Sequence, residues 1–160
     1  METIDLHICI TKIDEAELTE TERKVMDEAK AATQRSYSPY SHFSVGAAVL
    51  LNNGEIVSGC NQENCAFPSG LCAERTTLFY ANANYPDQPV TMLCIAARGS
   101  DGEFTPMPIA PCGACRQVML ETENRYGTPI RILLFGTEGI YAVRSAQDLL
   151  PVSFDSDKLI

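Results

Sequence analysis

The alternation of apolar and polar residues along the chain indicates where its strands lie. In TIDLHICI, residues 3–10, every second residue is aliphatic, which is typical of a short strand with one apolar face. Residues 43–60 contain two β-rich runs on either side of Asn53-Gly54, and this combination predicts a β-hairpin. Apolar runs predict further strands at residues 90–97, 130–135 and 139–143, the first two of them buried on both faces.

Helical spacing of apolar residues, among good helix formers, predicts three helices. The first covers residues 15–35, before Pro39 breaks the pattern. The second runs from about Cys72 to Asn82 and the third from about Cys112 to Gly127, and Ser145 is expected to cap a short helix before Pro151. The order of hairpin, helix, strand, helix and strand predicts an α/β sandwich with a mixed sheet.

Composition and charge narrow the class of protein. A chain of 160 residues with 45% hydrophobic content is expected to form one domain, residues 1–160. No apolar run approaches the ~20 residues that cross a bilayer, and the N-terminus has no signal-peptide pattern, so we expect a cytoplasmic protein with no membrane partner. The net charge of −9 argues against nucleic acid as a partner and favours a small, weakly charged ligand.

The seven cysteines do not suggest a disulfide framework, because their number is odd and no secretory signal precedes them. Cys112 and Cys115 form a C-x-x-C at a predicted helix start, where helix N–H groups favour thiolates. A catalytic zinc ion takes three protein ligands and keeps a fourth position for water. Cys72 opens the other helix after a strand, and is therefore the expected third ligand.

Glu74 and Arg75 follow this third cysteine in the stretch CAERT. A carboxylate beside a zinc-activated water can accept its proton and pass that proton to a substrate, so Glu74 is the expected catalytic residue. Three thiolates on one Zn²⁺ leave a net negative charge, and Arg75 would compensate it by donating to the sulfurs.

Simpler interpretations exist for each of these residues. Glu74 and Arg75 could be a solvated pair at a helix start. Free cysteines are often buried apolar residues, which is the expectation for Cys9, Cys60 and Cys94. Cys65 lies in a loop, and its position fits either a buried apolar residue or a functional one. A structural zinc module would need no Glu74, and a dithiol redox protein would use the C-x-x-C without a tightly bound metal.

The sequence resembles the cytidine deaminase family, in its short homotetrameric branch with three cysteine ligands. The resemblance covers about residues 36–159, and residues 1–14 form a strand-like extension outside it. It is carried by the segments SYSPYSHFSVGAA, GCNQEN, CAERT, PCGACRQ and LLPVSF. It implies a three-layer α/β/α sandwich around a five-stranded mixed sheet, one Zn²⁺ per chain on Cys72, Cys112 and Cys115, and a proton shuttle at Glu74.

The same resemblance implies roles for residues around a nucleoside. Asn61 and Glu63 would bind the ribose hydroxyls, and Phe43 would pack on the pyrimidine ring. Backbone groups of Cys65 and Ala73 would contact the base edge, and Phe154 would reach the site of a neighbouring subunit. Phe67 stands where the family often has a tyrosine, so a hydroxyl bond is missing there.

The resemblance implies zinc-dependent hydrolysis of cytidine and deoxycytidine to uridine and deoxyuridine, with release of ammonia, in pyrimidine nucleoside salvage. Rival substrates within the same fold are a deoxynucleotide, a nucleoside antibiotic or adenosine in tRNA. A nucleotide or tRNA would favour Lys or Arg around the pocket. Residues 36–46 and 60–70 contain neither, which favours an uncharged nucleoside.

Overall fold

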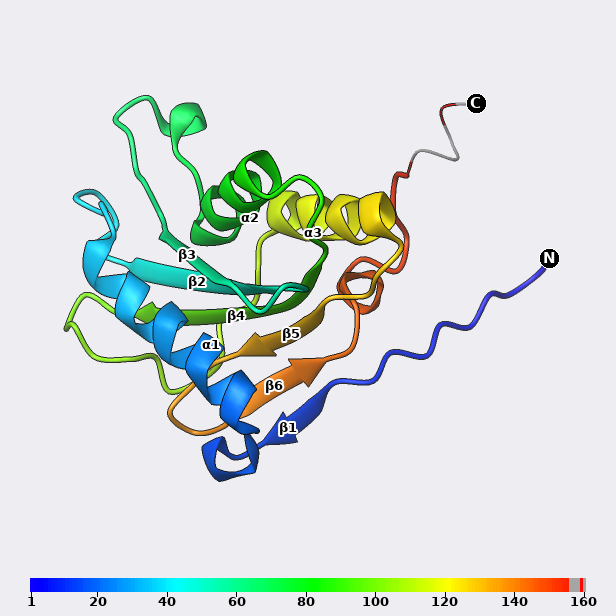
Figure 1. Cartoon of the computed structure of the whole chain (residues 1–160), viewed down its shortest axis with the longest axis horizontal. Coiled ribbons are helices and arrows are strands. Elements are labelled where there is room, and N and C mark those ends of the chain that lie inside the picture. The colour runs from blue at the N-terminus through cyan, green and yellow to red at the C-terminus, as the bar shows by residue number, and fades with distance from the viewer. Residues whose placement is uncertain (156–158, 160) are drawn as a thin grey trace.

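The computed structural model describes residues 1–155 and 159, and its centre is one mixed sheet (Figure 1). Over these residues the sheet has six strands in the order β1-β6-β5-β4-β2-β3. Neighbouring strands are antiparallel except β4 and β5, which are parallel. The strands are β1 (Thr11–Ile13), β2 (Ser44–Leu51), β3 (Ile56–Cys60), β4 (Val90–Arg98), β5 (Arg131–Leu134) and β6 (Ile140–Val143).

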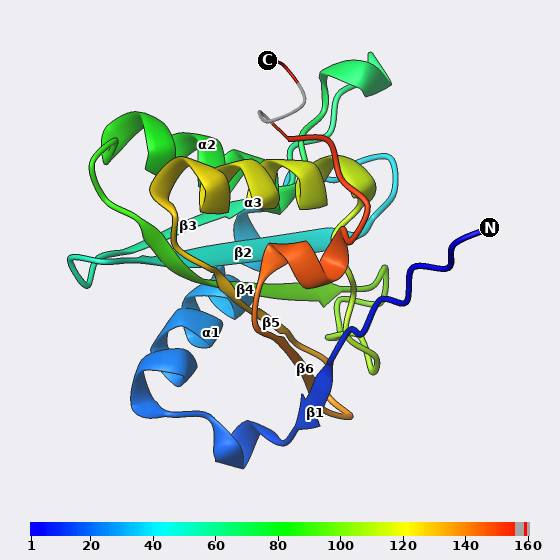
Figure 2. The ribbon, with the colours of Figure 1, turned by 90° about the vertical axis from the view of Figure 1, so that its right-hand side faces the viewer.

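Three α-helices cover the two faces of the sheet, which confirms the predicted three-layer architecture. Helix α1 (Glu20–Ala32) lies on one face, and α2 (Ala73–Asn84) and α3 (Gly113–Tyr126) lie next to each other on the other (Figures 1 and 2). Each face has its own apolar core, one between α1 and the sheet and a larger one beneath α2 and α3. None of the helices in the described part of the chain is long and apolar enough to cross a membrane.

Several turns and helix ends are found where short sequence patterns predicted them. Gly54 has φ 89° in the turn between β2 and β3, as the Asn-Gly dipeptide predicts. Thr19 caps α1 in a reciprocal pair with Glu22, and Gly127 ends α3 in the left-handed region at φ 60°. Ser145 caps the 3₁₀ helix Ala146–Leu149. Other 3₁₀ turns cover Glu15–Glu17, Thr33–Arg35 and Phe67–Ser69.

The prediction of a five-stranded sheet was wrong, because β1 adds a sixth strand at one edge. This strand covers Thr11–Ile13 and pairs with β6, whereas residues 3–10, where the alternation predicted a strand, are extended and exposed and belong to none. Alternation reports which side chains share a face, but it does not provide a neighbouring strand to pair with. The predicted helix at 15–35 is likewise divided, because the cap at Thr19 starts α1 after a separate 3₁₀ turn.

The loops from β3 to α2 and from β4 to α3 bring the N-termini of these two helices together. Helix α2 follows β3 and α3 follows β4, and the two helices run in parallel. Near their C-terminal ends, Asn82 Nδ2 donates to Thr122 Oγ1 at 3.4 Å. The parallel arrangement therefore places the cysteines at their N-termini next to one another.

Replacing Gly46 with Ala is expected to lower the free energy of unfolding by about 3 kcal/mol, which is the upper end of the range typical of overpacking. Gly46 lies where β2 passes closest to α1, and a Cβ there would lie 2.1 Å from the carbonyl oxygen of Ala29. Urea unfolding measures the effect. Gly113→Ala is the matched control, because a Cβ at Gly113 meets no described atom within 4 Å. Equal stability of the two variants would contradict the close approach of β2 and α1.

Candidate active site

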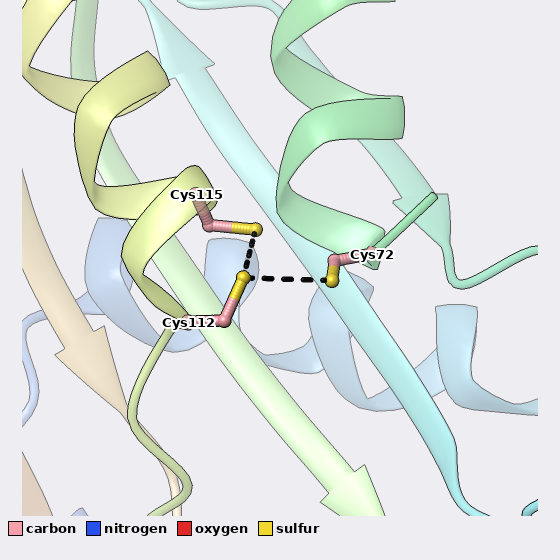
Figure 3. A group of neighbouring side chains, drawn as sticks. All are labelled: Cys72, Cys112 and Cys115. Atoms are coloured by element: carbon pink, nitrogen blue, oxygen red, sulfur yellow. Dashed lines mark hydrogen bonds between the residues drawn. The ribbon is translucent and has the colours of Figure 1, made fainter. Parts of the chain in front are cut away.

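Three cysteine sulfurs meet where α2 and α3 begin (Figure 3). Cys72 is the N-cap residue of α2, Cys112 is the N-cap residue of α3, and Cys115 lies in the first turn of α3. The Sγ atoms of Cys72 and Cys112 are 3.8 Å apart, and those of Cys112 and Cys115 are 3.5 Å apart. The structure thus joins the C-x-x-C to a cysteine forty residues away, as the sequence predicted.

The spacing of the three sulfurs fits a zinc ion. Tetrahedral zinc with Zn–S bonds of about 2.3 Å holds its sulfurs about 3.8 Å apart, close to the two separations observed. Neither helix start has a side-chain cap among the described residues, and the positive end of the helix dipole there favours thiolates. Cys115 is fully buried and Cys112 is exposed, which leaves the cluster open on one side.

Glu74 lies in the first turn of α2 and is only 4% exposed. Within the part of the chain that the structure describes, its Oε2 is buried without a hydrogen-bond partner. Burial raises the pKa of this carboxyl, and the neighbouring Cys72 adds to the effect. A buried carboxyl group with an unpartnered oxygen, next to a metal-ligand cluster, is suited to proton transfer.

Arg75 supplies positive charge to the same cluster. Its Nε is also buried and has no hydrogen-bond partner over the described residues. The Cys115 thiol, together with the Arg75 guanidinium, lowers the pKa of Cys72 to about 5. Arg75 therefore acts on the charge of Cys72, and its role in compensating the charge of three zinc-bound thiolates stays a prediction.

A cavity of about 830 Å³ opens over the cluster and over Glu74. This volume is typical of a site for a small organic molecule. Arg75 is the only cationic side chain among its described lining residues. The other predicted residues that line it are Phe43, Asn61, Glu63, Phe67, Cys72, Glu74 and Cys112.

Asn61 is a clamp between β3 and the loop that carries Phe43. Its Oδ1 accepts from Ser36 Oγ at 2.6 Å and from the backbone N of Val45 at 2.8 Å. Its Nδ2 donates to the carbonyl oxygen of Phe43 at 2.9 Å. One N–H of the amide is left for a ligand, so any contact with a sugar has to be added to this structural role.

Glu63 is similarly engaged with the loop across the cavity. Its Oε2 accepts from the backbone N of Tyr40 at 2.8 Å and of Ser41 at 3.2 Å, and its Oε1 accepts from the Ser41 hydroxyl. A carboxylate offers about four acceptor sites, so about one remains. Tyr40 also packs its ring edge-to-face with Phe67 at 5.8 Å.

The structure does not bring every predicted residue to the cavity. Cys65, Ala73 and Phe154 are absent from its described lining. Phe154 has an exposed side chain, and its carbonyl oxygen accepts from Gln117 Nε2 at 2.8 Å. The cavity is also lined by residues that the sequence did not predict, among them Tyr40, Ser41, Val45, Leu71, Ile95 and Ile109. Tyr40 and Ser41 lie within SYSPYSHF, so proximity to Phe43 was their available signal.

Replacing Asn61 with Ala is expected to lower the free energy of unfolding by about 1–3 kcal/mol and to raise KM for the substrate. The substitution removes three hydrogen bonds that hold the loop carrying Phe43. Denaturant unfolding and steady-state kinetics measure the two effects. Asn52→Ala, on the exposed hairpin turn, is the matched control. A raised KM with unchanged stability would instead indicate a direct ligand contact and no clamp.

A three-thiolate metal site beside a buried carboxylate, beneath a cavity for a small molecule, defines a metal-dependent hydrolase. Residues 19–126 match the family model described as the cytidine and deoxycytidylate deaminase zinc-binding region. The chain belongs to the cytidine deaminase family, and it is an enzyme with zinc as its cofactor.

Cytidine deaminases from other organisms are similar to this chain in sequence and in structure over most of its length. A cytidine deaminase of Sporosarcina psychrophila is 36% identical over 136 residues, which are 85% of this chain and 93% of that protein. The crystal structure of cytidine deaminase from Burkholderia pseudomallei has 40% identity and a TM-score of 0.71, covering 86% of this chain and all of that one. The cytidine deaminase from Mycobacterium tuberculosis has 30% identity and a TM-score of 0.64, covering 83% of this chain and 96% of that structure.

Proposed function

We propose that this enzyme hydrolyses the 4-amino group of cytidine and deoxycytidine, giving uridine or deoxyuridine and ammonia, in pyrimidine nucleoside salvage in the cytoplasm. The observation that carries the proposal is the buried Glu74 carboxylate, which lines a cavity of about 830 Å³ beside three thiols placed to hold a metal ion. The names of the relatives supply the substrate, since each is called a cytidine deaminase.

Glu74 is the group that moves protons in the proposed reaction. Cys72, Cys112 and Cys115 would hold the zinc ion, which as a Lewis acid would make a water molecule acidic enough to lose a proton near neutral pH. Glu74 accepts that proton and delivers it to N3 of the pyrimidine ring, which makes C4 electrophilic. It then carries the second proton to the leaving amine, so that one water is consumed and one ammonia is released.

The remaining residues of the cavity would orient the nucleoside. Phe43 and Phe67 would pack against the base. The backbone of Cys65 and Ala73, which the described lining does not include, would approach the edge of the base from beside the cavity. Asn61 and Glu63 would use their remaining hydrogen-bonding sites for the sugar hydroxyls. Phe154 would serve the site of a neighbouring subunit in a homotetramer, and its exposed ring is available for such a contact.

The charges of the cavity favour a nucleoside over a nucleotide. Arg75 is its only cation over the described lining, and it is directed to the thiols, whereas Glu63 contributes an anion. A 5′-phosphate would find no free positive partner among these lining residues and would be repelled by the carboxylate. The cavity therefore supports an uncharged substrate within a family whose description names both cytidine and deoxycytidylate.

The test compares cytidine, deoxycytidine and deoxycytidylate as substrates of the zinc-loaded enzyme. The loss of ultraviolet absorbance and the release of ammonia are followed together. We expect both nucleosides to be converted, with a kcat/KM at least about 100-fold above that of the nucleotide, since like charges across a site cost several kcal/mol. Preferred conversion of the nucleotide would overturn the substrate assignment. No conversion of any of the three, with zinc bound, would overturn the reaction and favour a structural zinc site.

A further inference from the structure

The N-terminal segment carries an apolar stripe that the rest of the described chain does not cover. Residues 1–10 are extended and lead away from the body of the molecule (Figures 1 and 2). The stripe consists of the alternate residues Ile4, Leu6, Ile8 and Ile10, which are 81%, 54%, 46% and 50% exposed. Four aliphatic side chains on one face of an extended segment are costly to leave in water, so the segment is expected to have a partner.

This segment continues directly into an open sheet edge. Strand β1 is the outermost strand and pairs only with β6 over the residues that the structure covers, so its other edge keeps unpaired N–H and C=O groups. Exposed edges of this kind are templates for another strand. The stripe and the open edge form one continuous surface, residues 1–13, which we call the N-terminal arm.

The sequence of the N-terminal arm is complementary to itself in an antiparallel register centred on His7. In this register a residue of one copy lies opposite a residue of the other copy, and their two residue numbers always add up to fourteen. On the face of the stripe, Ile4 lies opposite Ile10, Leu6 lies opposite Ile8, and Glu2 lies opposite Lys12. The other face pairs mostly small or polar residues, namely Thr3 with Thr11, Asp5 with Cys9 and His7 with itself.

Neighbouring registers lose this complementarity. Centring the pairing on Leu6 puts Glu2 opposite Ile10, and centring it on Ile8 puts Lys12 opposite Ile4. A shift by a single residue puts the apolar face of one arm beside the polar face of the other, because side chains alternate with period two. Cross-strand aliphatic and opposite-charge pairs each stabilise a sheet, so the register centred on His7 is favoured.

We propose that the N-terminal arms of two copies of this chain pair antiparallel about a two-fold axis at His7, and join the two sheets into one. Residues 1–3 of each copy then cover the open edge of the partner's β1. The bodies of the two copies lie at opposite ends of the paired arms and on opposite edges, because β6 occupies the inner edge of β1 in each. The contact is the same surface on both copies, which is the arrangement that closes a dimer.

A second copy is the occupant because the complementarity is internal to the arm. An unrelated partner would need a matching apolar stripe and a suitably placed charge, whereas another copy of this chain provides both at equal concentration. Lys12, which is exposed on β1, meets the partner's Glu2 in this register, and it forms no salt bridge with a described residue of its own chain.

The register is tested by disulfide trapping in the zinc-loaded protein with oxidised glutathione. Asp5→Cys puts a thiol opposite the partner's Cys9, so most of the protein should become a covalent dimer on non-reducing gels. The matched control adds Cys9→Ser to that variant, which leaves only the introduced thiol at position 5 of each arm. In this register the two position-5 thiols are four residues apart, or about 13 Å along the strands. Disulfides need Cα atoms within about 7 Å, so the control and the unmodified protein should give little dimer.

The contribution of the arm to assembly is tested separately by deleting residues 2–10. None of the deleted residues lines the cavity, so turnover per zinc should be unchanged while the mass in sedimentation falls, because a contact between copies is lost. An unchanged mass would overturn the proposal. A lower mass without trapping at Asp5→Cys would overturn the register and indicate that the arm binds another surface or another molecule. Equal trapping in the Cys9→Ser control would also overturn the register.

Discussion

Replacing Glu74 with Gln will reduce kcat for cytidine by at least about 10²–10⁴-fold, the range expected for a general acid–base residue. The amide has nearly the same shape as the carboxyl, but it cannot accept and return a proton. Burial already raises the pKa of Glu74, so a neutral group at this position suits the folded protein, and stability should not fall. Steady-state kinetics and metal analysis on the same sample measure turnover and bound zinc.

The zinc content decides how this result is interpreted. Because Glu74 is not expected to bind zinc, the Glu74→Gln variant should keep one ion per chain. Glu28→Gln, an exposed position on α1 on the far face of the sheet, is the matched control and should keep full turnover. A kcat of Glu74→Gln within about tenfold of the original would exclude the proton-shuttle role, since general acid–base catalysis contributes more than that. Loss of zinc together with turnover would show that the carboxylate supports the metal site instead.

Replacing Cys115 with Ala will weaken zinc binding by more than about 100-fold, since loss of even an indirect partner of a metal ligand costs 10–100-fold. Cys115 is fully buried and its Sγ lies 3.5 Å from that of Cys112, and no fourth ligand-type side chain joins the cluster among the described residues. Turnover should be lost with the metal. The unfolding temperature should also stop rising with added zinc, because metal binding to the folded state stabilises it.

Cys94→Ala separates the loss of a ligand from the loss of a buried thiol. Cys94 is equally buried, but it lies on β4 in the core beneath α1, away from the cluster. This variant should be less stable and should still bind one zinc ion with nearly unchanged turnover. If Cys115→Ala retains zinc as Cys94→Ala does, then the three-cysteine site is wrong.

Much of the fold followed from local patterns that act over a few residues. The Asn53-Gly54 turn, the apolar runs of β4 and β5, and the glycine that ends α3 are each determined by neighbouring residues, and each was predicted. Residues 3–10 show where such patterns fail. Their alternation is real, but the described chain offers them no neighbouring strand, and pairing begins only at Thr11.

The environment of the sugar-binding candidates illustrates a second limit. The family resemblance assigned Asn61 and Glu63 to the sugar hydroxyls. In the folded chain, Asn61 holds the loop of Phe43 and Glu63 holds the turn at Tyr40. These contacts join segments 18 and 23 residues apart, so neither the pattern of one segment nor that of the other contains them.

The sequence by itself determined the chemistry of this protein: thiols at two helix starts, a carboxylate two residues after one of them, and a negative net charge that disfavours nucleic acid. These properties belong to residue types and short spacings. The sequence predicted that Cys72 joins Cys112 and Cys115, but the sulfurs meet only in the tertiary structure, because the parallel packing of α2 and α3 on one face of the sheet brings the helix N-termini together. It also decided that Glu74 is buried, since burial depends on what packs over a side chain and not on its neighbours along the chain.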